Sequence, residues 1–285
     1  MPKSKKRPKT NQEDAQLWRV NALGGVELLR AYFTEFSYSP HTHDEFMFAA
    51  TEGGAALPQY RGNTFLHITG NVLALNPGEV HGGGPARGTY WRYRAFYVPP
   101  TLLQRVVQEF SGRDRGLPQF TENVLSDPDV TALFLQAHTA FEKPSSTLER
   151  ESRLLESLIH LVARHAVGKT PMNRIGLEIP AVKRAVEYLE TLPNEDISLE
   201  RLAREVGLSP YYLTRVFHEQ TGLPPHSYQT LVRVRLAKNL LAKGVPISEV
   251  AVEAGFFDQA HLTRHFKRVF GVTPGRYFGE LKAVA

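Results

Sequence analysis

The sequence predicts an α+β chain of several domains: a small N-terminal β-barrel, a middle segment of helices and an all-α C-terminal domain. Short β-rich runs separated by glycine-marked turns fill residues 17–100. From residue 101 onward, apolar residues recur instead with helical spacing. In the C-terminal part, one pattern of residues occurs twice, 49 positions apart. A length of 285 residues is enough for two or more domains.

Composition excludes several classes of site. The chain has no cysteine, so disulfides, thiolate nucleophiles and cysteine-ligated metal sites are excluded. The formal net charge of +5 is matched by five basic residues near the N-terminus: Lys3, Lys5, Lys6, Arg7 and Lys9. We expect residues 1–16 to form a basic, disordered tail. We find neither a signal peptide nor an apolar run long enough for a bilayer, so we expect a cytoplasmic protein without a membrane partner.

Residues 17–100 contain the predicted strands of the barrel. The strands expected from composition and turn signals are Phe46–Ala50, Phe65–Ile68, Val72–Leu75 and Tyr90–Val98. Turns are predicted at Glu52–Gly54, at Gly70-Asn71 and at Asn76–Gly78. Many short strands with regular turns indicate a sandwich or a barrel.

Three helices are expected in residues 101–167. Pro99-Pro100 precedes the first, Asp127-Pro128 begins the second, and the third covers 147–166. Their apolar stripes fit either packing against the β domain or a dimer seam, and we expect a homodimer. Residues 168–177 have no apolar period and are predicted to be a linker to the domain at 178–285.

The repeat in the C-terminal domain predicts two helix-turn-helix units. Its first copy consists of Leu213, Thr214, Arg215, Phe217, Gly222, Pro225 and Tyr228, and its second of Leu262, Thr263, Arg264, Phe266, Gly271, Pro274 and Tyr277. An apolar-periodic helix precedes each copy and ends at Gly207 or Gly255. The second helix of each unit begins after Ser209 or Asp258, both of which suit an N-cap. Such units place their second helix in the major groove of DNA.

The second helices carry side chains suited to DNA. The expected contact residues are Tyr211, Tyr212, Thr214 and Arg215 in the first unit, and Gln259, His261, Thr263, Arg264 and Lys267 in the second. Arginine pairs with guanine, glutamine pairs with adenine, and lysine suits phosphate. A helix from Tyr228 to Lys243 would span about 24 Å and hold the two units for successive major grooves. A helical bundle or short solenoid is the alternative.

The same region resembles the signature of the AraC/XylS family of transcription regulators. The matching residues are Arg235-Leu236-Ala237, Ile247, Val250-Ala251, Gly255-Phe256, Asp258, Leu262, Arg264, Phe266-Lys267, Gly271, Thr273-Pro274 and Tyr277. The resemblance implies that the base-reading positions are Tyr211, Thr214 and Arg215 in the first unit and Gln259, Ala260, His261 and Arg264 in the second. It implies double-stranded operator DNA as a partner, and we add RNA polymerase as a further expected partner.

Three histidines are expected to converge in the N-terminal barrel. His41 and His43 lie two residues apart on an extended segment and so point to one face, and His81 follows the turn at Asn76–Gly78. The pattern resembles a cupin, the barrel that AraC-type regulators often use for effector binding. The expected effector-binding residues are His41, His43, Glu45, His81, Trp91 and Arg94. We expect no cofactor; a metal on the three histidines, or histidines that only satisfy loop backbone, are the alternatives.

The function expected from the sequence is an effector-responsive transcription regulator that is not an enzyme, and we expect an activator. A small molecule in the barrel would change operator binding. One alternative is a metal-dependent cupin enzyme with accessory DNA binding. Another is a constitutive DNA-binding protein whose barrel only dimerises.

Overall fold

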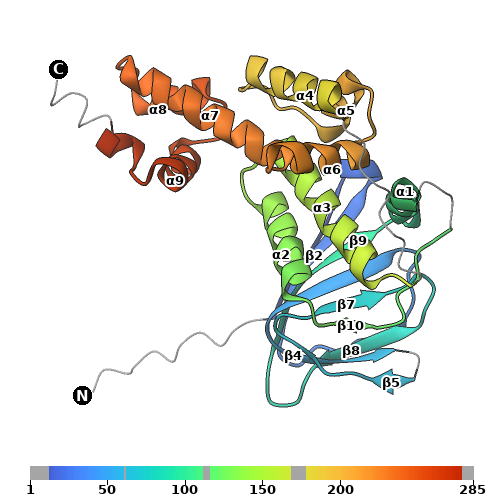
Figure 1. The fold of residues 1–285 in the computed structure, drawn as a ribbon. Coiled ribbons are helices and arrows are strands. Elements are labelled where there is room, and N and C mark those ends of the chain that lie inside the picture. Colours follow the sequence, from blue (N-terminus) through green and yellow to red (C-terminus); the bar gives the residue numbers. More distant parts are fainter. Residues whose placement is uncertain (1–12, 61, 112–115, 168–177, 278–285) are drawn as a thin grey trace, which may run out of the picture. The chain divides into compact units, whose positions relative to one another are not determined.

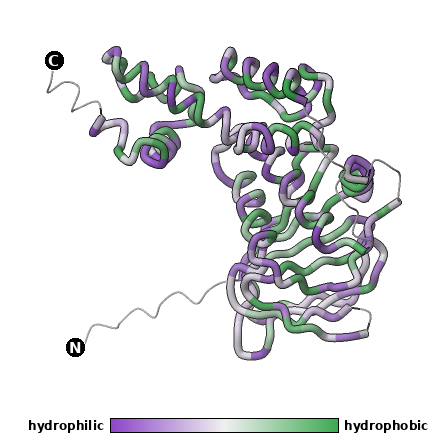
Figure 2. Tube along the Cα trace, in the orientation of Figure 1, coloured by the Kyte–Doolittle hydropathy of each residue, from purple (hydrophilic) through white to green (hydrophobic). Residues whose placement is uncertain are grey.

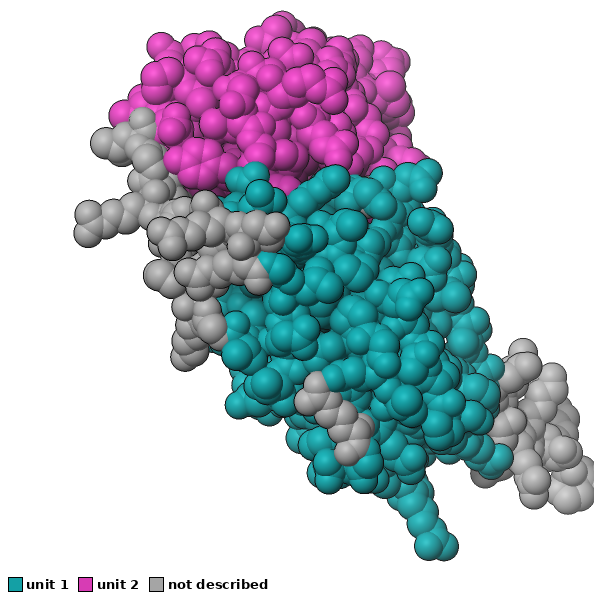
Figure 3. Space-filling model, turned by 90° about the vertical axis from the view of Figure 1, so that its right-hand side faces the viewer, with its two compact units in different colours: residues 1–138, 160–171 teal, residues 139–159, 172–285 magenta. Residues whose placement is uncertain are grey.

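The computed structural model describes residues 13–60, 62–111, 116–167 and 178–277, so most of the predicted tail and the linker at 168–177 lie outside it. The chain divides into two compact units (Figure 3). The first comprises residues 1–138 and 160–171, and the second comprises 139–159 and 172–285. Among the described residues, no helix is long and apolar enough to cross a membrane.

The first unit holds the strands of the described chain and the helices that follow them (Figure 1). Its strands are β1 (Asp14–Val20), β2 (Val26–Phe33), β3 (Tyr38–His41), β4 (Phe46–Tyr60), β5 (Asn63–Thr64), β6 (His67–Ile68), β7 (Val72–Leu75), β8 (His81–Pro85), β9 (Trp91–Val98) and β10 (Val124–Leu125). Its helices are α1 (Pro100–Ser111) and parts of α2 (Pro128–Glu142) and α3 (Thr147–His165). The fold is therefore a β-rich barrel followed by helices, and β1 already begins inside the predicted tail.

β4 joins the two halves of the barrel. Its first half pairs with β7 and β9 in the order β1-β2-β9-β4-β7-β10, and its second half pairs with β5, β6 and β8. The register shifts between Thr51 and Gly53, where the sequence predicted a turn. That prediction is wrong, because the strand continues through a bulge. Gly54 has φ +77°, and a Cβ there would lie 1.8 Å from the carbonyl oxygen of Tyr90.

Both faces of the main sheet are buried where residues 47–50 of β4 pair with β7. Met47 and Ala49 face the barrel interior, where they join a cluster that includes Leu73. Phe48 alternates with Met47 and Ala49 along β4 and pairs with Phe96 of β9, whose ring packs edge-on against Phe134 of α2 at 4.8 Å. Burial on both faces explains why these strands have continuous apolar sequences, which Figure 2 shows as green segments.

The second unit contains the N-terminal part of α3 and six further helices. These are α4 (Ile179–Thr191), α5 (Leu199–Val206), α6 (Pro210–Thr221), α7 (Pro225–Ala242), α8 (Ile247–Glu253) and α9 (Gln259–Phe270). The predicted caps are confirmed: Ser209 accepts a hydrogen bond from the N–H of Tyr212 at 3.2 Å, and Asp258 accepts one from His261 at 2.6 Å. Gly207 ends α5 with φ 73°. Helices α5 and α6, and then α8 and α9, form the two helix-turn-helix units.

Arg233 of α7 connects the two helix-turn-helix units. Its Nε donates to the carbonyl of Pro193 at 2.6 Å, and one terminal nitrogen donates to that of Glu195 at 3.0 Å. The same loop passes Gly255 so closely that a Cβ on that glycine would lie 2.6 Å from the Cα of Asn194. The loop before α5 is therefore held between α7 and the turn of the second helix-turn-helix unit. This fixes the two helix-turn-helix units relative to each other.

Candidate nucleic-acid interface and effector pocket

Helix α9 presents most of its predicted contact residues to solvent. Gln259, Ala260, Arg264 and Lys267 are exposed, and Thr263 is half-buried. Because the Asp258 cap fixes the first turn, the side chains near the helix N-terminus have a defined direction. Polar and basic side chains on an open helix face suit contact with bases and phosphates.

His261 differs from the prediction, because it is only 7 % exposed. Its ring packs edge-on against Phe256 at 5.4 Å and lies 4.7 Å from the ring of His265. Burial lowers the pKa of His261, which favours a neutral imidazole at pH 7. In this structure its ring packs beside the turn before α9 instead of facing solvent.

Helix α6 is less accessible than predicted. Tyr212 and Arg215 are half-buried, whereas Tyr211 and Thr214 are 7 % and 5 % exposed. The hydroxyl of Thr214 donates to the carbonyl of Pro210 at 2.8 Å, inside its own helix. The prediction that Tyr211 and Thr214 are exposed is therefore wrong for this conformation.

A pocket in the barrel brings predicted effector residues together. It is lined by Tyr38, His41, Met47, Pro58, Leu73, Leu75, His81, Gly82, Gly83, Trp91, Tyr93 and Tyr97. The ring of His81 lies 4.4 Å from that of His41 and 4.6 Å from that of His43. The prediction that the three histidines converge is thus confirmed in geometry. The free space is about 20 Å³, which holds about one water molecule, so a larger effector has to displace side chains.

Backbone carbonyls set the tautomers of the three histidines. The Nδ1 atoms of His41, His43 and His81 lie 2.9, 2.8 and 2.8 Å from the carbonyls of residues 39, 45 and 79. A carbonyl only accepts, so each Nδ1 carries a hydrogen, and in a neutral ring Nε2 is then an acceptor. Burial lowers the pKa of His43, and it lowers that of His81 to about 4. At pH 7 the rings of His43 and His81 are therefore neutral.

The histidine cluster does not fit a metal centre. Among the described residues, no group of three or more His, Asp or Glu side chains could hold a metal ion. The Nε2 atoms of His43 and His81 are buried and have no hydrogen-bond partner within the described part of the chain. They are therefore suited to accept hydrogen bonds from a bound molecule.

Residues that the sequence did not indicate hold the aromatic wall of the pocket. The indole N–H of Trp91 donates to Thr51 Oγ1 at 2.9 Å, and Thr51 Oγ1 lies 3.2 Å from His67 Nδ1. The ring of Trp91 stacks on Tyr93 at 3.9 Å, and the hydroxyl of Tyr93 lies 2.8 Å from that of Tyr38. No local motif marks Thr51 or His67, because strand pairing brings them to Trp91.

Glycines bring His41 next to His81. His41 pairs with His81 in the β3–β8 register. A Cβ on Gly82 would lie 2.8 Å from the carbonyl oxygen of Tyr38, and one on Gly83 would lie 2.4 Å from that of Leu57. The glycine run was therefore an available sequence signal for the close approach of three strands.

Three predicted effector residues, His43, Glu45 and Arg94, are not among the residues that line the pocket. Arg94 lies on the other face of β9, where its Nε donates to Glu52 at 2.8 Å and a terminal nitrogen lies 3.2 Å from His138 Nδ1. The backbone carbonyl of Glu45 accepts from His43, but the side chain of Glu45 is not part of the pocket wall. The positions of Arg94 and Glu45 give no support to an effector-binding role, whereas the ring of His43 lies beside that of His81, which does line the pocket.

Both parts of the chain are similar in sequence to known proteins. Residues 23–158 match the AraC-like ligand binding domain, and residues 202–280 match a helix-turn-helix domain. The uncharacterized HTH-type transcriptional regulator YbfI of Bacillus subtilis (strain 168) is 31 % identical over 222 residues, which are 78 % of this chain and 80 % of that protein. The arabinose operon regulatory protein of Escherichia coli (strain K12) is 25 % identical over 269 residues, covering 91 % and 90 %. Among solved structures, the C-terminal domain of AraT from Geobacillus stearothermophilus is 30 % identical and covers 38 % of this chain and 88 % of that one, with a TM-score of 0.34.

Proposed function

Because the chain belongs to the AraC family of helix-turn-helix transcription regulators, we propose that α6 and α9 read one double-stranded operator and that a small molecule in the barrel changes this binding. The chain is a DNA-binding transcription regulator with a ligand-binding domain and not an enzyme. The alternative of a metal-dependent cupin enzyme is therefore not retained.

The exposed face of α9 carries the DNA part of the proposal. Arg264 and Gln259 are free of the helix-turn-helix core, and Lys267 and Arg268 lie in the last turn. Arg264 suits bidentate contact with guanine and Gln259 with adenine, while the basic residues suit phosphate. Arg233 supports a DNA site with two parts. It holds α7 on the loop before α5 and so fixes the second helix-turn-helix unit relative to the first helix-turn-helix unit.

In vitro selection from a randomised duplex library tests this proposal. We expect the protein to select a defined DNA sequence. Arg264→Ala should relax the base preference at one or two base pairs and weaken the free energy of DNA binding by about 1–3 kcal/mol. Lys183→Ala on α4 is the matched control, since it removes one exposed positive charge away from α9. Failure to enrich any sequence, or unchanged selectivity in Arg264→Ala, would contradict the assigned role.

The barrel pocket supports an uncharged effector that carries O–H or N–H groups. The neutral histidines offer acceptors, and the stacked Trp91 and Tyr93 offer an apolar wall. Sugars are the first compounds to test, because one relative is named for an arabinose operon. The chain has two tryptophans, so Trp18→Phe leaves Trp91 as the reporter. We expect a bound sugar to change Trp91 emission and DNA affinity; charged ligands alone doing so would contradict the proposed class.

We further propose that the regulator activates transcription as a homodimer that contacts RNA polymerase. Support for this comes from the family to which the chain belongs. The apolar stripes of the middle helices do not add to it, because Leu103 of α1 and Leu154 and Leu158 of α3 are fully buried within one chain. A promoter fusion carrying the selected site tests activation, and sedimentation of the full chain tests the dimer. Reduced reporter output on expression of the protein, or a monomer at micromolar concentration, would contradict these proposals.

A further inference from the structure

Helix α6 buries a face that does not belong to its helix-turn-helix core. Its core residues Leu213, Val216 and Phe217 are fully buried. Tyr211, Thr214 and His218 follow one another at spacings of three and four, so they share the opposite face of the helix. Tyr211 and Thr214 are nevertheless buried, which requires something other than the core to cover this face.

The N-terminal part of α3, residues 147–159, contacts α6 at His218, which shares this face. Oε1 of Glu156 is 4.0 Å from Nδ1 of His218. In the preceding turns, Asp196 accepts hydrogen bonds from both the N–H and the hydroxyl of Thr147, each at 2.7 Å. Glu151 accepts a hydrogen bond from Leu199 at 2.7 Å. Polar contacts therefore join this part of α3 to the loop before α5, to the first residue of α5 and to α6.

The same part of α3 extends toward α7 and one flank of α9. The carboxylate of Glu149 acts on His261 and Arg233, where it partly offsets the lowering of their pKa by burial. Arg153 acts electrostatically on His226 and on His265. The exposed face of α9 stays open, because Arg264 and Lys267 remain solvent-exposed.

We propose that residues 147–159 of α3 mask the DNA-reading face of α6, so that in this conformation only α9 is available to DNA. This rests on the proposed function, which assigns Tyr211 and Thr214 to base reading. A duplex that reached these residues and His218 would meet the side chain of Glu156, and a carboxylate repels phosphate. Release of α3 from α6 would then extend the bound site from one major groove to two.

The position of α3 in the chain fits this role. Its last residues, Arg164 and His165, belong to the first unit, where both contact Asp127. One helix therefore contributes contacts to the effector-binding unit at one end and to the DNA-binding unit at the other. An event in the first unit that alters α3 has a direct route to the face of α6.

An opened variant tests the masking. Asp196→Ala combined with Glu156→Ala removes contacts at two points of α3 and changes no residue assigned to DNA reading. Because it also removes two negative charges, the control is Glu205→Ala with Glu253→Ala, two exposed carboxylates on α5 and α8. In selections from a randomised duplex library, we expect the wild type and the control to select one block, meaning one run of specified base pairs. The opened variant should gain a second block about one helical turn away.

Each outcome has a distinct meaning. A wild-type protein that selects two blocks as strongly as the opened variant would overturn the masking proposal, while leaving the proposed function intact. An absence of any selected sequence in all proteins, or selection that Arg264→Ala does not change, would count against the proposed function itself. An opened variant that selects only the wild-type block while keeping its helical circular dichroism also contradicts masking.

Cross-linking provides a second test that does not depend on destabilising α3. The natural sequence has no cysteine, so Glu156→Cys with His218→Cys provides the two reactive thiols of the variant. Joining them with a short cleavable cross-linker should hold α3 on α6 and lower affinity for the two-block duplex by about fivefold or more, with recovery after cleavage. Equal affinity before and after cleavage would overturn the proposal.

Discussion

Oε2 of Glu151 accepts a hydrogen bond from the backbone N–H of Leu199, 2.7 Å away, at the first residue of α5. Burial raises the pKa of Glu151 to about 7, and the bond from Leu199 offsets this only in part. The nearby carboxylates of Glu200 and Asp196 raise the pKa further, whereas Arg150 lowers it. Near pH 7 a substantial fraction of native molecules therefore carries a proton on Glu151.

This pKa predicts the pH dependence of stability. An unfolded glutamate titrates near 4.5, so between about pH 4.5 and 7 the native state binds more protons than the unfolded state. The contribution of Glu151 to stability should therefore fall as pH rises through this window and then level off. We expect Glu151→Gln, measured by urea unfolding, to gain stability relative to the wild type between pH 5 and pH 8. The exposed control Glu205→Gln should show no such trend, and a pH-independent difference for Glu151→Gln would contradict the prediction.

Arg233 provides a prediction about how the two helix-turn-helix units are held together. Arg233→Ala removes the donor to the carbonyl of Pro193 and one of the two donors to that of Glu195, which keeps Gln229, at a cost of about 2–4 kcal/mol. Arg235 on the same helix is exposed, and Arg235→Ala should change stability by less than about 0.5 kcal/mol. Urea unfolding of the two variants checks this prediction. Equal stabilities would show that the loop before α5 does not depend on Arg233.

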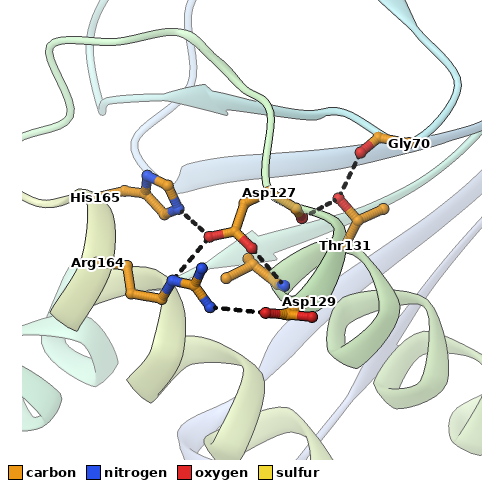
Figure 4. A network of polar contacts seen from close by, with 7 residues as sticks. Gly70, Asp127, Asp129, Thr131, Arg164 and His165 are labelled. Carbon is orange, nitrogen blue, oxygen red and sulfur yellow. Dashed lines mark hydrogen bonds and ion pairs between the residues drawn. The ribbon is translucent and has the colours of Figure 1, made fainter.

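Asp127 and its neighbour Asp129 provide a second matched pair of variants for a stability prediction. Its carboxylate accepts from the N–H of Val130, from His165 at 2.8 Å and from Arg164 at 2.9 Å, whereas the Asp129 side chain is 81 % exposed (Figure 4). Burial opposes ionisation of Asp127, but these partners outweigh it and lower its pKa. We expect Asp127→Ala to cost about 2–4 kcal/mol and Asp129→Ala less than about 1 kcal/mol. Since the native pKa is depressed, the Asp127 contribution should be present above pH 4 and decline below it.

The measurement is thermal or urea unfolding of the two variants at pH 7 and at pH 3. The difference in the free energy of unfolding between the wild type and Asp127→Ala should be smaller at the lower pH, because protonation of the Asp127 carboxylate removes its ion pairs. A gap that stays constant would assign the effect to packing instead of charge.

Features set by local chemistry were predictable. Ser209 and Asp258 cap their helices because a side-chain oxygen next to the first turn satisfies an unpaired N–H, and no distant residue is needed. Gly53 and Gly54 were ambiguous, since glycine serves both a turn and a bulge. Only the pairing of β4 with β9, which the local sequence does not specify, decides between them.

The candidate site was predictable only where one segment determined it. Trp91 and Arg94 lie three residues apart in one strand, so alternation already places them on opposite faces, and the two could not share a pocket. The burial of Tyr211 and Thr214 had no sequence signal, because the helical period shows which face avoids the core but not what covers it. Thr51 reaches Trp91 through strand register, which a single sequence does not reveal.

Thr51 leads to the last prediction. His67 Nε2 lies 3.1 Å from the carbonyl of Asn71, so Nε2 carries the hydrogen and Nδ1 accepts. The Thr51 hydroxyl therefore donates to His67 and accepts from the Trp91 indole. Burial lowers the pKa of His67 to about 4, which keeps the ring neutral at pH 7. Thr51→Val leaves a buried indole N–H without an acceptor and should cost about 1–3 kcal/mol.

Thr51→Ser retains the hydroxyl and should restore most of the loss, and Thr69→Val at an exposed hydroxyl should have little effect. Urea unfolding measures stability, and the emission of Trp91 in a Trp18→Phe background measures its surroundings. Because the hydrogen bond fixes the ring that stacks on Tyr93, Thr51→Val should also weaken binding of any ligand that shifts Trp91 emission. Full ligand affinity in Thr51→Val would show that the pocket does not require a fixed indole.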